Sequence, residues 1–140
     1  MVRNAAAAVT GLVIAFVLIM LIEKLGHFIY PPPADLDFSD PEALRPYIAT
    51  LPFLALLFPM IAWVVATFAG TVVASKIGTA NPKSFGIIVG GLVLAGTIAN
   101  LVMIPHPLWF SLVSLVAVAA SAWIAVRVAS GPEKQTPAVD

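Results

Sequence analysis

Long apolar runs alternate with short polar stretches along the whole chain. The first run, residues 5–22, has no charged side chain and a single polar one, Thr10. Because a helix rises about 1.5 Å per residue, this run nearly crosses the hydrocarbon core of a bilayer, which is roughly 30 Å thick. Further runs of similar character follow, so the pattern predicts a polytopic membrane protein.

Prolines and polar residues set the ends of the predicted spans. The three prolines at positions 31–33 stop the first helix, because proline lacks the amide hydrogen that a continuing helix needs. The turn at residues 105–107, Pro-His-Pro, is so short that the helices on either side must run antiparallel. We therefore expect an all-α fold, a bundle of four antiparallel transmembrane helices in a single domain over residues 1–130. The predicted spans are residues 5–29, 47–75, 84–104 and 108–128.

The loop after the first span, residues 31–46, is a long polar stretch. Its charged residues are Asp35, Asp37, Asp40, Glu42 and Arg45. Residues 39–42, Ser-Asp-Pro-Glu, have the pattern of a capped helix start with proline at the first position, which predicts a short surface helix. The second span contains Pro52 and Pro59, which we expect to kink it.

The basic residues near the spans predict the orientation of the chain. Five lie on the side shared by both termini and two on the other: Arg3, Lys76, Lys83, Arg127 and Lys134 against Lys24 and Arg45. Because basic residues favour the cytoplasmic side, both termini are expected there. The first apolar run is longer than the roughly 7 to 15 residues of a signal-peptide core, so we expect an uncleaved span. Residues 131–140 are expected to form a disordered cytoplasmic tail.

The composition narrows the function classes. The chain is 61% hydrophobic and only 10% charged, with seven basic and seven acidic residues. This balance provides no basic face for nucleic acid, so we expect the lipid bilayer as a partner and no nucleic acid. Cysteine is absent, which excludes disulfides, thiolate zinc sites and iron–sulfur clusters.

Small residues recur at helical spacing in two of the predicted spans. They are Ala62, Ala66, Gly70 and Ala74 in the second span, and Gly86 and Gly90 in the third. Such stripes let helix backbones approach closely in lipid. We expect helix packing along them, either within one subunit or between the subunits of an oligomer.

Four polar residues are expected to gather at the outer edge of the bundle: Glu23, His27, Asn100 and His106. Glu23 and His27 are four residues apart and so share one helical face. Together with His106 they are candidate metal ligands, because imidazole and carboxylate groups suit divalent cations. The alternative role is structural, with Glu23 pairing with His27, Lys24 or Arg45 at the membrane surface.

Haem ligation by His27 and His106 is a further alternative, disfavoured because His106 lies in a turn between two prolines. The chain has no nucleophile–base pair, phosphate-binding loop or zinc-protease motif, so we assign no catalytic residue and expect no cofactor other than a metal ion. Every Asp, Glu, Lys and Arg lies at the end of a predicted span or outside it. This placement disfavours a charge-driven carrier, which needs ionisable groups at membrane depth.

Three motifs carry a resemblance to a known group of proteins. They are Glu23-x-x-x-His27-Phe28-Ile29-Tyr30-Pro31, Ala49-Thr50-Leu51-Pro52 and Ile104-Pro105-His106-Pro107-Leu108-Trp109-Phe110. Over residues 14–127 the chain resembles an uncharacterised family of small bacterial four-helix membrane proteins. The resemblance implies an integral protein of the bacterial cytoplasmic membrane and brings no assigned activity.

Packing motifs without recognisable chemistry favour a structural or accessory membrane protein over an enzyme. Such a protein acts through helix contacts, as a homo-oligomer or in a larger membrane complex. One alternative is a small oligomeric transporter or channel for a neutral or apolar solute. The other is an outer-face metal site at Glu23, His27 and His106.

Overall fold

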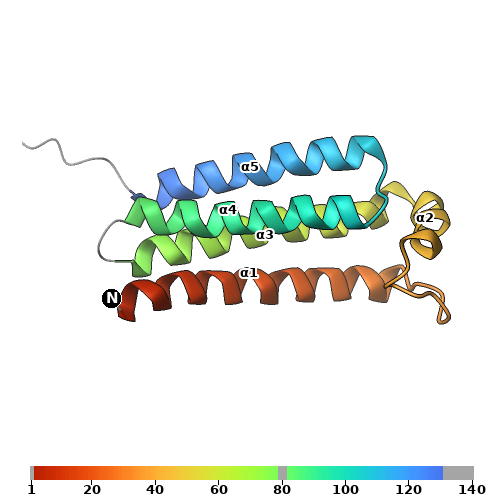
Figure 1. The fold of residues 1–140 in the computed structure, drawn as a ribbon, viewed down its shortest axis with the longest axis horizontal. Helices are drawn as coiled ribbons and strands as arrows, with labels where there is room; N and C mark the ends of the chain where they lie inside the picture. The colour runs from red at the N-terminus through yellow and green to blue at the C-terminus, as the bar shows by residue number, and fades with distance from the viewer. Residues whose placement is uncertain (1, 79–81, 131–140) are drawn as a thin grey trace, which may run out of the picture.

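The computed structural model describes residues 2–78 and 82–130, and over these residues the regular structure is helical. In chain order the helices are α1 (Val2–Ile29), α2 (Pro41–Thr50), α3 (Phe53–Ile77), α4 (Pro82–Met103) and α5 (Leu108–Ser130). The four long helices lie side by side, and short α2 caps one end of the bundle (Figure 1). The expected all-α bundle of four antiparallel helices is confirmed. The tail expected at residues 131–140 lies outside the described residues.

Four helices in the described part of the chain are long and apolar enough to cross a membrane, as an integral membrane protein requires. They cover Arg3–Ile29, Phe53–Ile77, Lys83–Met103 and Leu108–Ala129. Three of them end within two residues of the predicted spans 5–29, 84–104 and 108–128. Large apolar side chains such as Phe16, Val102 and Val116 are exposed on the outside of the bundle, as contact with lipid tails requires.

The expected second span, residues 47–75, is not one helix. Residues 47–50 belong to α2, and the chain is extended at Leu51 and Pro52, with ψ angles of 134° and 153°. Pro52 causes the break, because a proline has no amide hydrogen and disfavours the helical conformation of the residue before it. By contrast, α3 continues through Pro59.

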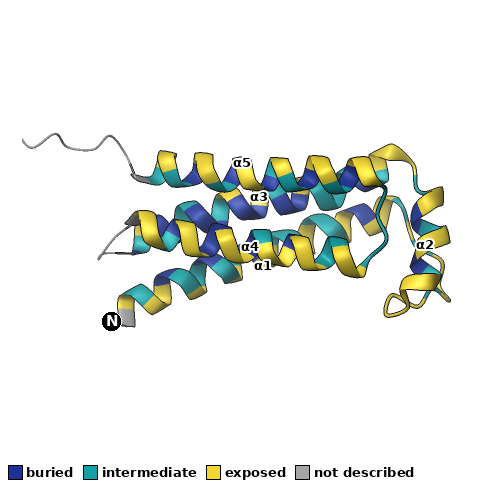
Figure 2. Cartoon of the chain, turned by 45° about the horizontal axis from the view of Figure 1, so that its top comes forward, coloured by how far each residue is buried: buried dark blue, intermediate teal, exposed yellow. Residues whose placement is uncertain are grey.

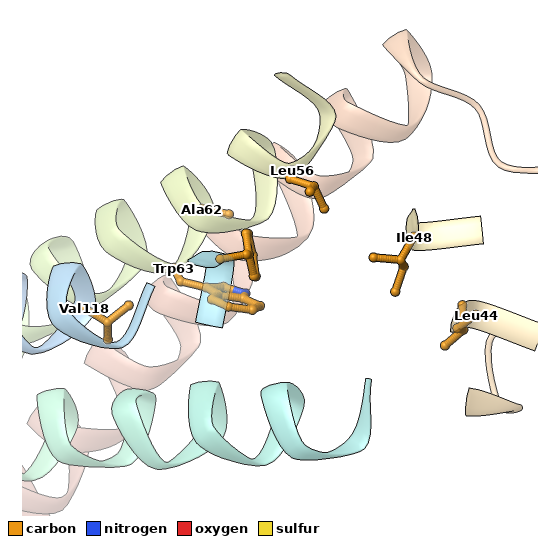
Figure 3. Packing of buried hydrophobic residues seen from close by; sticks show 7 residues of the cluster. Leu44, Ile48, Leu56, Ala62, Trp63 and Val118 are labelled. Carbon is orange, nitrogen blue, oxygen red and sulfur yellow. The ribbon is translucent and has the colours of Figure 1, made fainter. Parts of the chain in front are cut away.

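Helix α2 starts where the sequence predicts and packs one face on the bundle. Its N-cap is Asp40, whose Oδ1 accepts a hydrogen bond from the Glu42 amide at 2.9 Å, and Pro41 occupies the first position. Leu44 and Ile48, four residues apart, are buried. Figure 3 shows both side chains pointing toward the end of the bundle, where they join the core cluster that contains Trp63.

Helix α3 is the central element of the bundle, because it packs against α1, α4 and α5. Most of its buried positions are small or hydroxyl residues, and Figure 2 shows dark-blue buried residues along this helix. Its predicted stripe of Ala62, Ala66, Gly70 and Ala74 is fully inside the subunit. A Cβ on Gly70 would lie 2.6 Å from the carbonyl oxygen of Gly11, so α1 and α3 cross in direct backbone contact.

The predicted glycine pair of α4 also packs within the subunit. A Cβ on Gly86 would collide with the Ser75 hydroxyl of α3, and one on Gly90 would lie 2.9 Å from Cβ of Ala122 on α5. Both glycines are buried, whereas their neighbour Gly91 is exposed and a Cβ there would meet nothing within 4 Å. Gly86 and Gly90 of α4 therefore pack inside the subunit, whereas Gly91 lies on the outer face of the same helix.

Candidate functional site

A cavity of about 200 Å³ lies under α2, between α2 and one end of the bundle. We call it the α2 cavity. Its polar lining includes all four residues that the sequence places at this edge, Glu23, His27, Asn100 and His106. Glu23 and His27 come from the last turns of α1, Asn100 from the last turn of α4, and His106 from the link to α5. The fold therefore brings the candidate polar residues to one place.

Glu23 is held by a tryptophan that the sequence analysis does not assign to the site. Trp63 Nε1 donates a hydrogen bond to Glu23 Oε1 at 3.3 Å, and Trp63 is only 5% exposed. Within residues 2–78 and 82–130, no ion pair involves Glu23. Of the expected partners, neither Lys24 nor Arg45 forms an ion pair with this carboxylate, and Arg45 Nη2 instead lies 3.6 Å from Glu42 Oε1. His27, one turn further along α1, interacts electrostatically with Glu23.

His106 presents an acceptor nitrogen when its ring is neutral. Its Nδ1 lies 2.9 Å from the carbonyl oxygen of Ile104, which can only accept, so Nδ1 carries the proton and Nε2 carries the lone pair. Burial lowers the pKa of His106 below its ordinary value, while the hydrogen bond to Ile104 opposes this shift. The ring stacks on Phe110, with 4.7 Å between centroids, and meets Trp63 edge-on at 6.2 Å.

Asn100 provides an acceptor without a partner. Its Oδ1 is buried, and no donor in the described residues reaches it. One turn earlier, the Thr97 hydroxyl donates to the carbonyl oxygen of Val93 at 3.1 Å and is satisfied. A buried acceptor left unpaired costs about 1–3 kcal/mol, so a donor that entered the cavity and reached this atom would be bound favourably.

Aromatic rings form much of the remaining wall. Tyr30 and Phe58 meet edge to face with 6.2 Å between centroids, and Phe38 packs on the His27 ring at 6.0 Å. Tyr47 faces the cavity from α2, and burial raises the pKa of its hydroxyl, which keeps it neutral. The acceptors of Glu23, Asn100 and His106 therefore lie among aromatic side chains, of which Tyr30 and Tyr47 also carry a hydroxyl.

The structure does not form the expected metal site. Although Glu23, His27 and His106 line one cavity, no three His, Asp or Glu side chains in the described ranges are placed to share a metal ion. The two imidazoles pack on different rings, His27 on Phe38 and His106 on Phe110.

Sequence reasoning missed Trp63, Tyr30 and Tyr47 as members of the site. A usable signal was present for one of them, because Glu23 is the sole acidic residue in the four long helices. A tryptophan N–H buried within a membrane helix needs an acceptor, and few are available at that depth. Which tryptophan reaches Glu23 depends on the sides that α1 and α3 turn toward each other, and in the fold it is Trp63.

Comparison of the chain with protein-family models, curated proteins and solved structures gave no match. The chemistry of the α2 cavity is therefore deduced from its own groups, the acceptors of Glu23, Asn100 and His106 and the rings around them.

Proposed function

We propose that the protein binds a small organic cation, an amine or a quaternary ammonium group, in the α2 cavity. The observation that carries this proposal is a carboxylate, Glu23, placed in an aromatic cavity beside His27 but, in the described part of the chain, without a lysine or arginine. Among the described residues that line the cavity, none is Lys or Arg. A carboxylate withdrawn from water is costly unless it is paired, so a cationic ligand supplies what the site lacks.

The acceptors and the rings fit different parts of such a ligand. A protonated amine offers only donors, and Glu23, Asn100 and His106 offer acceptors. A quaternary ammonium group has no N–H, so the Glu23 charge and the aromatic faces would hold it. The aromatic faces of Trp63 and its neighbours attract a cation through their quadrupoles, by about 0.5–2 kcal/mol for each well-placed ring. The volume of about 200 Å³ is smaller than the roughly 300–1,000 Å³ of sites for drug-sized ligands, which favours a small amine or a head group.

The test is a titration of the purified full chain with choline and with its neutral analogue, in which carbon replaces the nitrogen. Calorimetry should show saturable binding of choline and none of the neutral analogue. Glu23→Gln should lower the affinity for choline by roughly tenfold, which is about the effect of one partly buried charge–charge contact. The matched control is Glu42→Gln, because Glu42 is exposed on α2. Equal binding of the two probes, or full affinity in Glu23→Gln, would refute the proposal.

The proposed location is the bacterial cytoplasmic membrane, with the α2 end outside and both termini in the cytoplasm. The charge distribution supports this orientation. In the described residues, the end opposite α2 carries Arg3, Lys76, Lys83 and Arg127 and no acidic residue. The α2 end is acidic, and basic residues favour the cytoplasmic side. Because the chain has no cysteine, a single Ser39→Cys variant in intact cells should react with a membrane-impermeant maleimide, and Lys76→Cys should not.

A structural or accessory role through helix contacts is the second candidate function. It is supported by one face of α4, where Gly91, Ala95 and Ala99 are exposed at four-residue spacing. Small residues at this spacing allow another helix to approach closely in lipid. Ala95→Leu, tested by co-purification from native membranes, should release a partner chain if this face is used, and an unchanged subunit composition would count against the role.

A further inference from the structure

A second hollow lies between α4 and α5, toward the end of the bundle opposite α2. We infer that this groove binds one anionic phospholipid, with the phosphate held by Lys83 and Arg127 and an acyl chain along the helices. The groove has a volume of about 650 Å³, and its lining includes Lys83, Gly90, Gly91, Trp123 and Arg127. It contains none of the residues of the α2 cavity, so the inference is independent of the proposed amine site.

The floor of the groove is apolar because α4 contributes glycine where a side chain would fill the space. Gly90 lies against Ala122, and a side chain at Gly91 would meet nothing within 4 Å. The groove extends along α4 from Lys83 to Leu94, which corresponds to about 16 Å of helix. This length of apolar surface suits an acyl chain, and a soluble anion would leave it unused.

The two cations stand together at one end of the groove. Lys83 begins α4 and Arg127 is near the end of α5, and the antiparallel arrangement of these helices brings the two to the same level. The Arg127 guanidinium carbon lies 3.9 Å from the centroid of the Trp123 ring, a cation–π contact that orients the group. A guanidinium binds phosphate with two parallel hydrogen bonds, and tryptophan is typical of the membrane interface.

Charge complementarity selects an anionic lipid as the occupant. Among the described residues, the charged side chains that line the groove are Lys83 and Arg127, and its lining includes no carboxylate. A second copy of the chain suits the groove less well. Across a two-fold axis the same surface meets itself, and Lys83 and Arg127 would approach their own copies, which like charges oppose.

The experiment is native mass spectrometry of the full chain in detergent, titrated with phosphatidylglycerol or with phosphatidylcholine of identical acyl chains. Phosphatidylglycerol should bind more tightly, and Lys83→Gln and Arg127→Gln should each weaken it by roughly fivefold, the effect of one basic residue at a membrane surface. Lys76→Gln is the matched control, because Lys76 is exposed near the same end and does not line the groove.

A second variant tests the apolar part of the groove. Gly91→Leu has room for its side chain, should fold, and should weaken the binding of phosphatidylglycerol without removing a charge. Equal affinity for the two lipids in the unaltered chain would overturn the inference, and so would an equal loss in Lys76→Gln. A lipid-free dimer that Gly91→Leu abolishes would assign the groove to a second copy instead.

Discussion

The contact between α1 and α3 and the contact between α4 and α5 both use glycine, with opposite results. At the first contact Gly11 and Gly70 face each other, and a Cβ on either would lie 2.6 Å from the carbonyl oxygen of the other. At the second contact, Gly90 meets Ala122 but Gly91 faces open space in a groove of about 650 Å³. Glycine closes a contact when the backbone of another helix faces it, and leaves a hollow when no other atom lies within reach.

The largest expected loss of stability comes from adding a side chain at the contact between α1 and α3. Gly70→Leu should destabilise the fold by about 3 kcal/mol, because its side chain would collide with the backbone of α1, which cannot rotate away. Gly91→Leu should change the stability by less than about 0.5 kcal/mol. The measurement is the unfolding free energy in detergent followed by circular dichroism. Equal effects of the two substitutions would remove the distinction between the closed and the open contact.

Removing the hydrogen bond between Trp63 of α3 and Glu23 of α1 should cause the next largest loss of stability. Trp63→Phe keeps the ring but removes the N–H that donates to Glu23, which leaves that carboxylate without its partner and costs about 1–2 kcal/mol. Glu23→Gln in the same background should recover part of the loss, because the group left unpaired is then uncharged. Trp123→Phe on the exposed face of α5 is the control. A double-mutant cycle with zero coupling would show that the bond does not stabilise the contact.

A smaller loss of stability is expected when the pH is lowered, through His106 in the turn between α4 and α5. Because the pKa of His106 is lowered in the folded protein, the unfolded chain takes up the proton more readily as the pH falls. This contribution to stability is therefore complete above the ordinary histidine pKa of about 6.5 and is lost as the pH falls below it. The thermal midpoint should fall between about pH 7.5 and about pH 5.5, and fall less in His106→Gln. Parallel pH profiles for the two proteins would contradict the assignment.

The helices could be predicted because each is specified locally. Runs without charge define four membrane-length helices, and Asp40 followed by Pro41 specifies the start of α2 within four residues of sequence. The two prolines of the expected second span show where local information ends. Pro52 ends the segment and Pro59 is accommodated within α3, although both stand in apolar surroundings. A proline inside a helix leaves a carbonyl without its donor, and whether that carbonyl finds another donor depends on the neighbouring helices. The sequence of one segment does not show which helices are its neighbours.

The candidate site could be predicted in part for the same reason. Topology alone brings Glu23, His27, Asn100 and His106 to one edge, since the first three lie near helix ends at this edge and His106 lies in the link between α4 and α5 there. Trp63 lies well inside α3, and its approach to Glu23 depends on the rotation of α3 about its axis. Small-residue spacing suggests that helices meet but does not distinguish the buried Gly90 from the exposed Gly91.

The proline inside α3 also affects what can be learned from side-chain substitutions. Pro59 has no amide hydrogen, so the carbonyl of Ala55, four residues earlier, lacks its usual helical donor. Both residues line the α2 cavity. The main chain beside the cavity thus has a carbonyl without its helical donor, and no exchange of a polar side chain changes this. Only replacement of the proline, for example Pro59→Ala, would restore the donor.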